Sequence, residues 1–202
     1  MKENTVKKYV LWTMVLLIYF GLPTLILFNV LNFNYKFIYL TIGGLLVYII
    51  MRILKYDNSL MGLTLHKTKY SILSVLPITI ILLIIGIILF FTGYGNRFNP
   101  TETLSFYIFY LFISSPIQEF LYRGALPRIL NSINLNESLI CIITSLLYSY
   151  VHIIYRDFLT LILTFLIGLI WYRCYKKSSN LIGVSISHAV LGILTIMIGI
   201  ID

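Results

Sequence analysis

The chain has 202 residues, of which 59% are hydrophobic and only 11% are charged. Soluble domains carry about 25% charged residues, so this composition excludes an ordinary soluble protein and predicts an integral membrane protein. A net charge of +8 would suggest nucleic acid as a partner of a soluble protein, but in membrane proteins basic residues gather at the cytoplasmic ends of the helices. We therefore expect contact with membrane lipid and no nucleic-acid partner.

Apolar segments of membrane-spanning length follow one another along the chain, where a helix needs about 20 such residues. In chain order, the predicted spans are 9–30, 37–54, 71–92, 103–131, 138–155, 157–174 and 181–201. Short polar connections separate them, and the sequence shows neither a repeat of fixed period nor a second soluble domain. These features predict one integral membrane domain over residues 1–202, an all-α polytopic helix bundle of about seven transmembrane helices.

The fourth segment, 103–131, is unusually long and contains Pro116. Two interpretations remain open: one tilted helix, or two pieces joined at Ser115-Pro116, one of them an eighth, re-entrant element. Ser115 and Gln118 fit a capping box with Pro116 at the first helical position, which predicts that a helix starts or restarts at Ser115.

The basic residues predict the orientation of the chain. If the N-terminus lies inside, only Lys36, Arg97 and Arg156 fall on the outer side, and Arg123 lies within the bilayer. The eleven others fall on the cytoplasmic side: Lys2, Lys7, Lys8, Arg52, Lys55, Lys67, Lys69, Arg128, Arg173, Lys176 and Lys177. Because cytoplasmic loops carry the excess of Lys and Arg, we expect the N-terminus inside and the C-terminus outside.

An acid and a base lie at bilayer depth in the fourth segment. Glu119 and Arg123 are four residues apart, so they share one face of a helix, with the acid in the favourable N-terminal position. An ionised side chain at the bilayer centre costs roughly 2.5–3.5 kcal/mol even on the mildest scale. Residues of this kind within a membrane are therefore candidates for function.

Two histidines join them from other spans, His152 from the fifth segment and His188 from the seventh. At about 1.5 Å per helical residue, Glu119 and His152 lie about 21 and 22 Å from the inner connections, and His188 about 12–14 Å. Helix tilt can absorb part of this difference, so we expect Glu119, His152 and His188 to converge on an intramembrane cavity. The competing interpretation is three separate polar residues, each hydrogen-bonded to neighbouring hydroxyls and amides.

A glutamate and two histidines around a wet cavity suit hydrolysis. One group can take a proton from water as the water attacks a carbonyl, while another donates a hydrogen bond to the oxyanion. The same three side chains could bind Zn²⁺, because two histidines and a carboxylate form a known type of catalytic zinc site. No His-Glu-x-x-His helix is present, so the sequence leaves open whether zinc or no metal is used.

At these residues the chain resembles the CAAX-protease and bacteriocin-processing family (CPBP, also called Abi) of intramembrane proteases. The family pattern is Glu-Glu-x-x-x-Arg on one helix, Phe-x-x-x-His on the next, and His-x-x-x-Asn or Asp on a later one. The corresponding stretches here are Gln118-Glu119-Phe-Leu-Tyr-Arg123, Tyr148-Ser-Tyr-Val-His152 and His188-Ala-Val-Leu-Gly192. They occur in the family's order within residues 100–200, which we expect to form the family-like core.

The resemblance implies roles for these residues and marks two departures. In the family, the first glutamate acts as general base together with the histidine of the second motif, and the second glutamate pairs with the arginine. Here Gln118 stands at the first position, and an amide cannot take a proton from water. Gly192 replaces the final Asn and offers no side-chain donor, which leaves His188 alone to bind an oxyanion. Tyr148 in place of Phe is a mild change.

The candidate catalytic residues are therefore Glu119, His152 and His188, with Gln118, Arg123, Tyr148 and Gly192 in support. The resemblance implies an intramembrane endopeptidase of the bacterial cytoplasmic membrane, with Glu119 or His152 as base. Its substrate would be a membrane-associated or lipidated peptide that reaches the site laterally or from the cytoplasmic side. The alternative is a catalytically degraded relative that binds a peptide or a partner membrane protein, for example in bacteriocin immunity or export. A small transporter is a third, weaker interpretation, because the spans show no inverted repeat.

Overall fold

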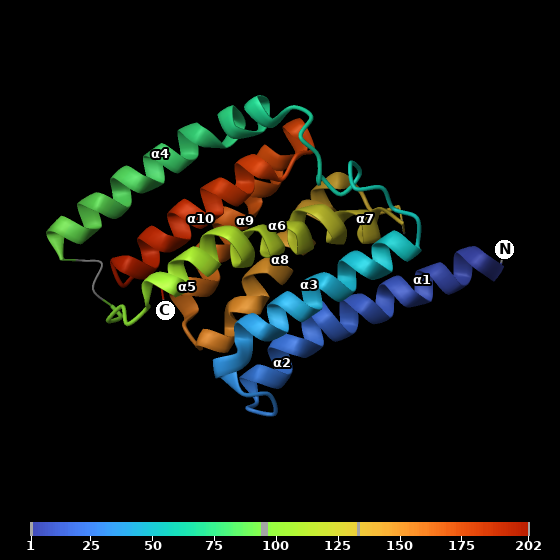
Figure 1. Cartoon of the computed structure of the whole chain (residues 1–202), viewed down its shortest axis with the longest axis horizontal. Coiled ribbons are helices and arrows are strands. Elements are labelled where there is room, and N and C mark those ends of the chain that lie inside the picture. The colour runs from blue at the N-terminus through green and yellow to red at the C-terminus, as the bar shows by residue number, and fades with distance from the viewer. Residues whose placement is uncertain (1, 94–96, 133, 202) are drawn as a thin grey trace.

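The computed structural model describes residues 2–93, 97–132 and 134–201. Residues 94–96 and Ile133, in two of the predicted polar connections, lie outside the described residues, as do the terminal Met1 and Asp202. Every regular element in the described part is helical, and the long helices run back and forth as a bundle (Figure 1). The all-α polytopic architecture predicted from the sequence is confirmed.

Within the described residues, six helical segments are long and apolar enough to cross a membrane. They are Val6–Leu27, Phe33–Ile53, Thr68–Thr92, Leu104–Asn131, Glu137–Tyr155 and Phe158–Ser178. The seventh predicted span is shorter, because α10 covers only Ile182–Met197, 16 residues, or about 24 Å of helix. It closes at Gly199, which adopts the left-handed backbone with a φ of +67° that commonly ends helices. The protein is an integral membrane protein.

Local geometry subdivides these segments. The first comprises α1 (Lys2–Met14), a π-helical turn at Val15–Gly21 and α2 (Leu22–Leu27). The second is a 3₁₀ turn at Phe33–Tyr35 followed by α3 (Lys36–Ile53). The third is α4 (Thr68–Thr92), the fifth is α8 (Glu137–Tyr150) with a 3₁₀ turn at Val151–Tyr155, and the sixth is α9 (Phe158–Ser178).

The fourth segment is one continuous helix with two π-helical turns. Its parts are α5 (Leu104–Phe109), a π turn at Tyr110–Ser114, α6 (Ser115–Glu119), a π turn at Phe120–Ala125 and α7 (Leu126–Asn131). The backbone N–H of Ser115 donates to the carbonyl of Tyr110, five residues back. This wider hydrogen bonding accommodates Pro116, which has no N–H to donate. The single-helix interpretation therefore holds, and the re-entrant element is absent from the described chain.

The start of α6 differs from the predicted capping box. The helix does begin at Ser115, but the residue before it makes no side-chain cap. The Gln118 amide instead donates to Ser114 Oγ at 3.1 Å. A cap is unnecessary because the preceding π turn already satisfies the first backbone groups of α6.

The packing of the helices brings the three motifs to one interior. Helix α10 contacts both α4 and α6, and α8 packs along α9 (Figure 1). The outward face of α4 is apolar and exposed at Ile80, Ile81, Ile84 and Ile88. A surface of this kind is covered by lipid in a membrane protein.

Candidate active site

Glu119 and Arg123 form a buried ion pair. Glu119 Oε1 accepts a hydrogen bond from Arg123 Nη1 at 3.1 Å, and neither side chain is more than 2% exposed. The guanidinium also lies 4.1 Å from the centre of the Tyr148 ring, whose electron-rich face attracts a cation. The pair that the four-residue spacing predicted is present.

His188 binds the same carboxylate from α10. Its Nδ1 lies 2.7 Å from Glu119 Oε1, and Trp171 of α9 stacks on its ring at a centroid distance of 4.8 Å. A carboxylate paired with Arg123 accepts hydrogen bonds, so we assign a proton to His188 Nδ1. The other ring nitrogen, Nε2, then lies on the opposite side of the ring, 3.4 Å from Tyr148 Oη.

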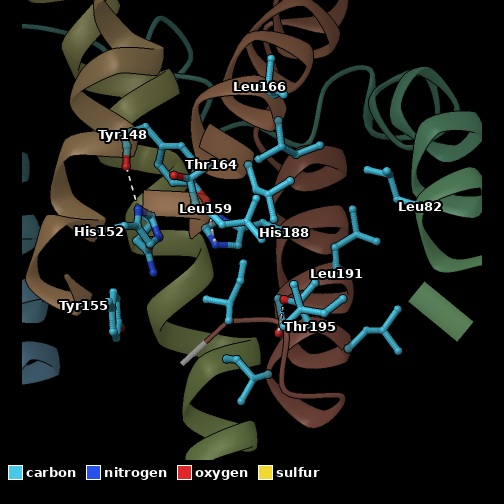
Figure 2. Close-up of a pocket in the computed structure, with 18 of the residues that line it drawn as sticks. Leu82, Tyr148, His152, Tyr155, Leu159, Thr164, Leu166, His188, Leu191 and Thr195 are labelled. Atoms are coloured by element: carbon cyan, nitrogen blue, oxygen red, sulfur yellow. Dashed lines mark hydrogen bonds between the residues drawn. The ribbon is translucent and has the colours of Figure 1, made fainter. Parts of the chain in front are cut away.

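His152 also packs against the Tyr148 ring, from the 3₁₀ turn after α8. Its Nδ1 is 2.8 Å from the backbone carbonyl oxygen of Tyr148, the hydrogen bond drawn in Figure 2. A carbonyl oxygen only accepts, so we assign the proton to Nδ1, and Nε2 keeps its lone pair. The ring centroids of His152 and His188 lie 5.1 and 5.7 Å from that of Tyr148. Both imidazoles therefore pack against the same aromatic ring.

The turn that carries His152 is fixed by the residues that follow it. Arg156 has a left-handed backbone with a φ of +56°, and Asp157 then caps α9 by accepting the Thr160 N–H at 2.9 Å. Arg97 holds the same carboxylate at 2.6 Å. The hydrogen bonds from Arg97 and then Thr160 hold the pKa of Asp157 well below its usual value, so this cap stays ionised at neutral pH.

A cavity of about 650 Å³ opens beside the histidines, a size typical of small-molecule sites. Gln118, Tyr148, His152 and His188 supply polar groups to its lining. The rest of the wall is mainly apolar and comes from α4, α9 and α10, as the labelled leucines in Figure 2 show. A wall of this composition suits a lipid-like group or an apolar peptide segment.

Gln118 and Glu119 face different parts of the interior. Gln118 lines the cavity, whereas Glu119 is fully buried, at 0% exposed, and bonds to His188 from behind. Consecutive helical residues point about 100° apart, and α6 keeps this offset. The structure therefore places His152, His188 and Gln118 at the cavity, with Glu119 and Arg123 in a layer behind them.

The three candidate ligands do not fit a zinc site. Among the described residues, no group of three His, Cys, Asp or Glu side chains could hold a metal ion. Glu119 and His188 bond to each other, whereas His152 Nδ1 bonds to the backbone carbonyl oxygen of Tyr148. The predicted alternative of Glu119, His152 and His188 as metal ligands is therefore not supported by their geometry.

Two aromatic residues that the sequence analysis did not single out belong to this site. Trp171 fixes the plane of the His188 ring, and Tyr110 packs against Gly192. A glycine that faces a polar site from a helix is a signal that another group approaches closely. That signal does not reveal which residue approaches, because the neighbour comes from a distant helix.

The comparisons with known proteins bear on the region that carries all three motifs. Residues 100–194 match the family described as Rce1-like, type II CAAX prenyl endopeptidase Rce1-like. Neither the curated proteins nor the solved structures gave a match to the chain. The matched region spans most of the expected core at 100–200 and includes Gln118, Glu119, Arg123, His152 and His188. Over this region, the chain is similar to the Rce1-like family of type II CAAX prenyl endopeptidases, which agrees with the resemblance that the three motifs indicated.

Proposed function

We propose that the protein is an intramembrane endopeptidase that hydrolyses a membrane-associated peptide with water activated by His152. The observation that carries this proposal is the pair of imidazoles that lines one mainly apolar cavity, each with its Nδ1 held by a fixed hydrogen-bond acceptor. The match to a CAAX-type protease family supports the same reaction class.

In the proposed reaction, His152 Nε2 takes a proton from water while the water oxygen attacks the scissile carbonyl carbon. The Gln118 amide oxygen accepts the second hydrogen of that water and orients it, which does not require the amide to act as a base. His152 then gives its proton to the leaving nitrogen as the carbon–nitrogen bond breaks. A positioned histidine of this kind contributes about 10²–10⁴ in rate.

In the same proposed reaction, His188 donates a hydrogen bond to the developing oxyanion. In this proposal His188 acts as an imidazolium, whose Nδ1–H donates to the Glu119 carboxylate while its Nε2–H is available to the substrate. His188 Nε2 then donates a hydrogen bond to the carbonyl oxygen as that oxygen gains charge. Glu119 is thus a positioning residue for His188, and Arg123 in turn holds Glu119.

A second candidate function is favoured by Gln118. This residue lines the cavity where the family places a glutamate base, so the chain can also be understood as a degraded relative that binds a peptide or a partner membrane protein. Bacteriocin immunity or export would be roles of that kind.

The experiment that separates the two functions uses the purified full chain in detergent and a pool of membrane-anchored peptides. Cleavage by the native chain supports the peptidase. No cleavage by the native chain, together with cleavage by Gln118→Glu, identifies a degraded enzyme that functions by binding. If neither the native chain nor Gln118→Glu cleaves any peptide of the pool, the result contradicts the peptidase and favours partner binding.

A further inference from the structure

The position of Gly192 poses a chemical problem for the proposed reaction. Gly192 follows His188 by one helical turn on α10 and also lines the cavity. It contributes no hydrogen-bond donor, although an oxyanion is best held by two. The question is whether another side chain reaches the same place.

Tyr110 occupies the space where a side chain at residue 192 would begin. A Cβ built on Gly192 would overlap the Tyr110 phenol, with the hydroxyl oxygen as the nearest atom and the ring carbons Cε1 and Cζ next, each at 2.7 Å. Tyr110 itself is 9% exposed and lines the same cavity. The phenol therefore stands in the place of the missing side chain.

The same phenol lies beside the other donor. The ring centroids of Tyr110 and His188 are 5.9 Å apart, at an interplanar angle of 74°. Tyr110 reaches this point from the π turn at Tyr110–Ser114, whereas His188 and Gly192 come from α10. A hydroxyl and an imidazole from two helices thus meet at one wall of the cavity.

We propose that Tyr110 is a catalytic residue whose hydroxyl donates the second hydrogen bond to the oxyanion, beside His188. This inference rests on the proposed peptidase function. As water adds to the carbonyl, its oxygen gains an electron pair, and the Tyr110 O–H donates to that oxygen without transferring its proton. When the carbon–nitrogen bond breaks, the carbonyl reforms and the hydrogen bond weakens.

The arrangement explains why a glycine stands at residue 192. Only a residue without Cβ lets the phenol approach the α10 backbone this closely. The hydrogen-bond donor that α10 lacks at residue 192 is thus supplied by Tyr110 from another helix. Gly192→Ala should therefore lower activity by displacing the hydroxyl, even though it removes no polar group.

The test is the kcat and KM of the purified full chain on a peptide that the native protein cleaves. We expect Tyr110→Phe to lower kcat by about 10²–10³, the usual effect of removing one oxyanion donor, with little change in KM. Tyr107→Phe is the matched control, since Tyr107 lies one turn earlier and does not line the cavity; it should keep the native kcat. The double variant Tyr110→Ala/Gly192→Asn should regain part of the activity that Tyr110→Ala loses.

The outcomes separate this inference from the function beneath it. A native kcat in Tyr110→Phe overturns the role of Tyr110 and leaves the peptidase standing. A loss of kcat that comes with a lowered unfolding temperature and is not recovered in the double variant shows a packing role and also overturns it. No cleavage by the native chain overturns both proposals.

Discussion

At the scale of single residues, Glu119 is the group on which the site depends. Its Oε1 accepts hydrogen bonds from Arg123 and His188 at once. Its Oε2 and Arg123 Nη2 have no hydrogen-bond partner among the described residues. A buried ion pair often stabilises a fold no better than apolar packing does, but removing one partner leaves an uncompensated charge. The carboxylate therefore fixes the orientation of His188 at some expense of stability.

Replacing Arg123 with alanine should destabilise the protein strongly. The change leaves Glu119 buried without its cation, and breaking a buried pair costs about 3–5 kcal/mol. Chemical unfolding in detergent measures the effect. Arg52→Ala is the matched control, because Arg52 pairs with Asp57 at 3.9 Å on an exposed surface, where such pairs contribute about 0–1 kcal/mol. Equal stability of native protein and Arg123→Ala would show that the Glu119–Arg123 pair does not stabilise the fold.

The sequence predicted the Glu119–Arg123 pair, but not which part of the interior its residues face. Four-residue spacing was enough to place Glu119 and Arg123 on one helix face. Which interior each residue faces depends on the two π turns around α6, and those turns leave no signature in the sequence that we can name. The selection of Gln118 for the cavity and of Glu119 for His188 therefore required the structure.

At the scale of elements, hydropathy predicted the long helices well and their local geometry poorly. The apolar runs place six spans within a few residues of the observed bounds. The local geometry of the fourth segment could not be predicted, because Pro116 is compatible with a break, a kink or a π turn. The seventh ends early because Gly199 closes α10, while the apolar residues continue beyond it. Tyr110 could not be found from sequence, since its contact with Gly192 joins helices 82 positions apart.

At the scale of the whole molecule, the cavity reaches one end of the bundle. Its lining includes Lys36 at the start of α3 and Arg97 after α4. These are two of the three basic residues that the charge count assigns to the outer side. We therefore propose that a substrate reaches the site laterally or from the outer end, which replaces our expectation of access from the cytoplasmic side.

This orientation predicts the labelling of two single-cysteine variants in intact cells. Asn99→Cys lies at the proposed outer end and Lys177→Cys at the inner end, and both positions are exposed. A membrane-impermeant thiol reagent should label the first variant and not the second, and a reporter fused after Asp202 should read as external. The native Cys141 and Cys174 are buried, so they give little background. Labelling of Lys177→Cys alone would show that the chain has the opposite orientation, with the cavity opening on the cytoplasmic side.

The most direct test of the account compares kcat for the native chain, His152→Ala and His66→Ala on one cleaved peptide. In the proposed reaction, the lone pair of His152 takes the proton from water, so its loss should lower kcat by about 10²–10⁴. His66 lies in an exposed loop and should leave kcat unchanged. A native kcat in His152→Ala, with the fold intact, would contradict hydrolysis by water that His152 activates.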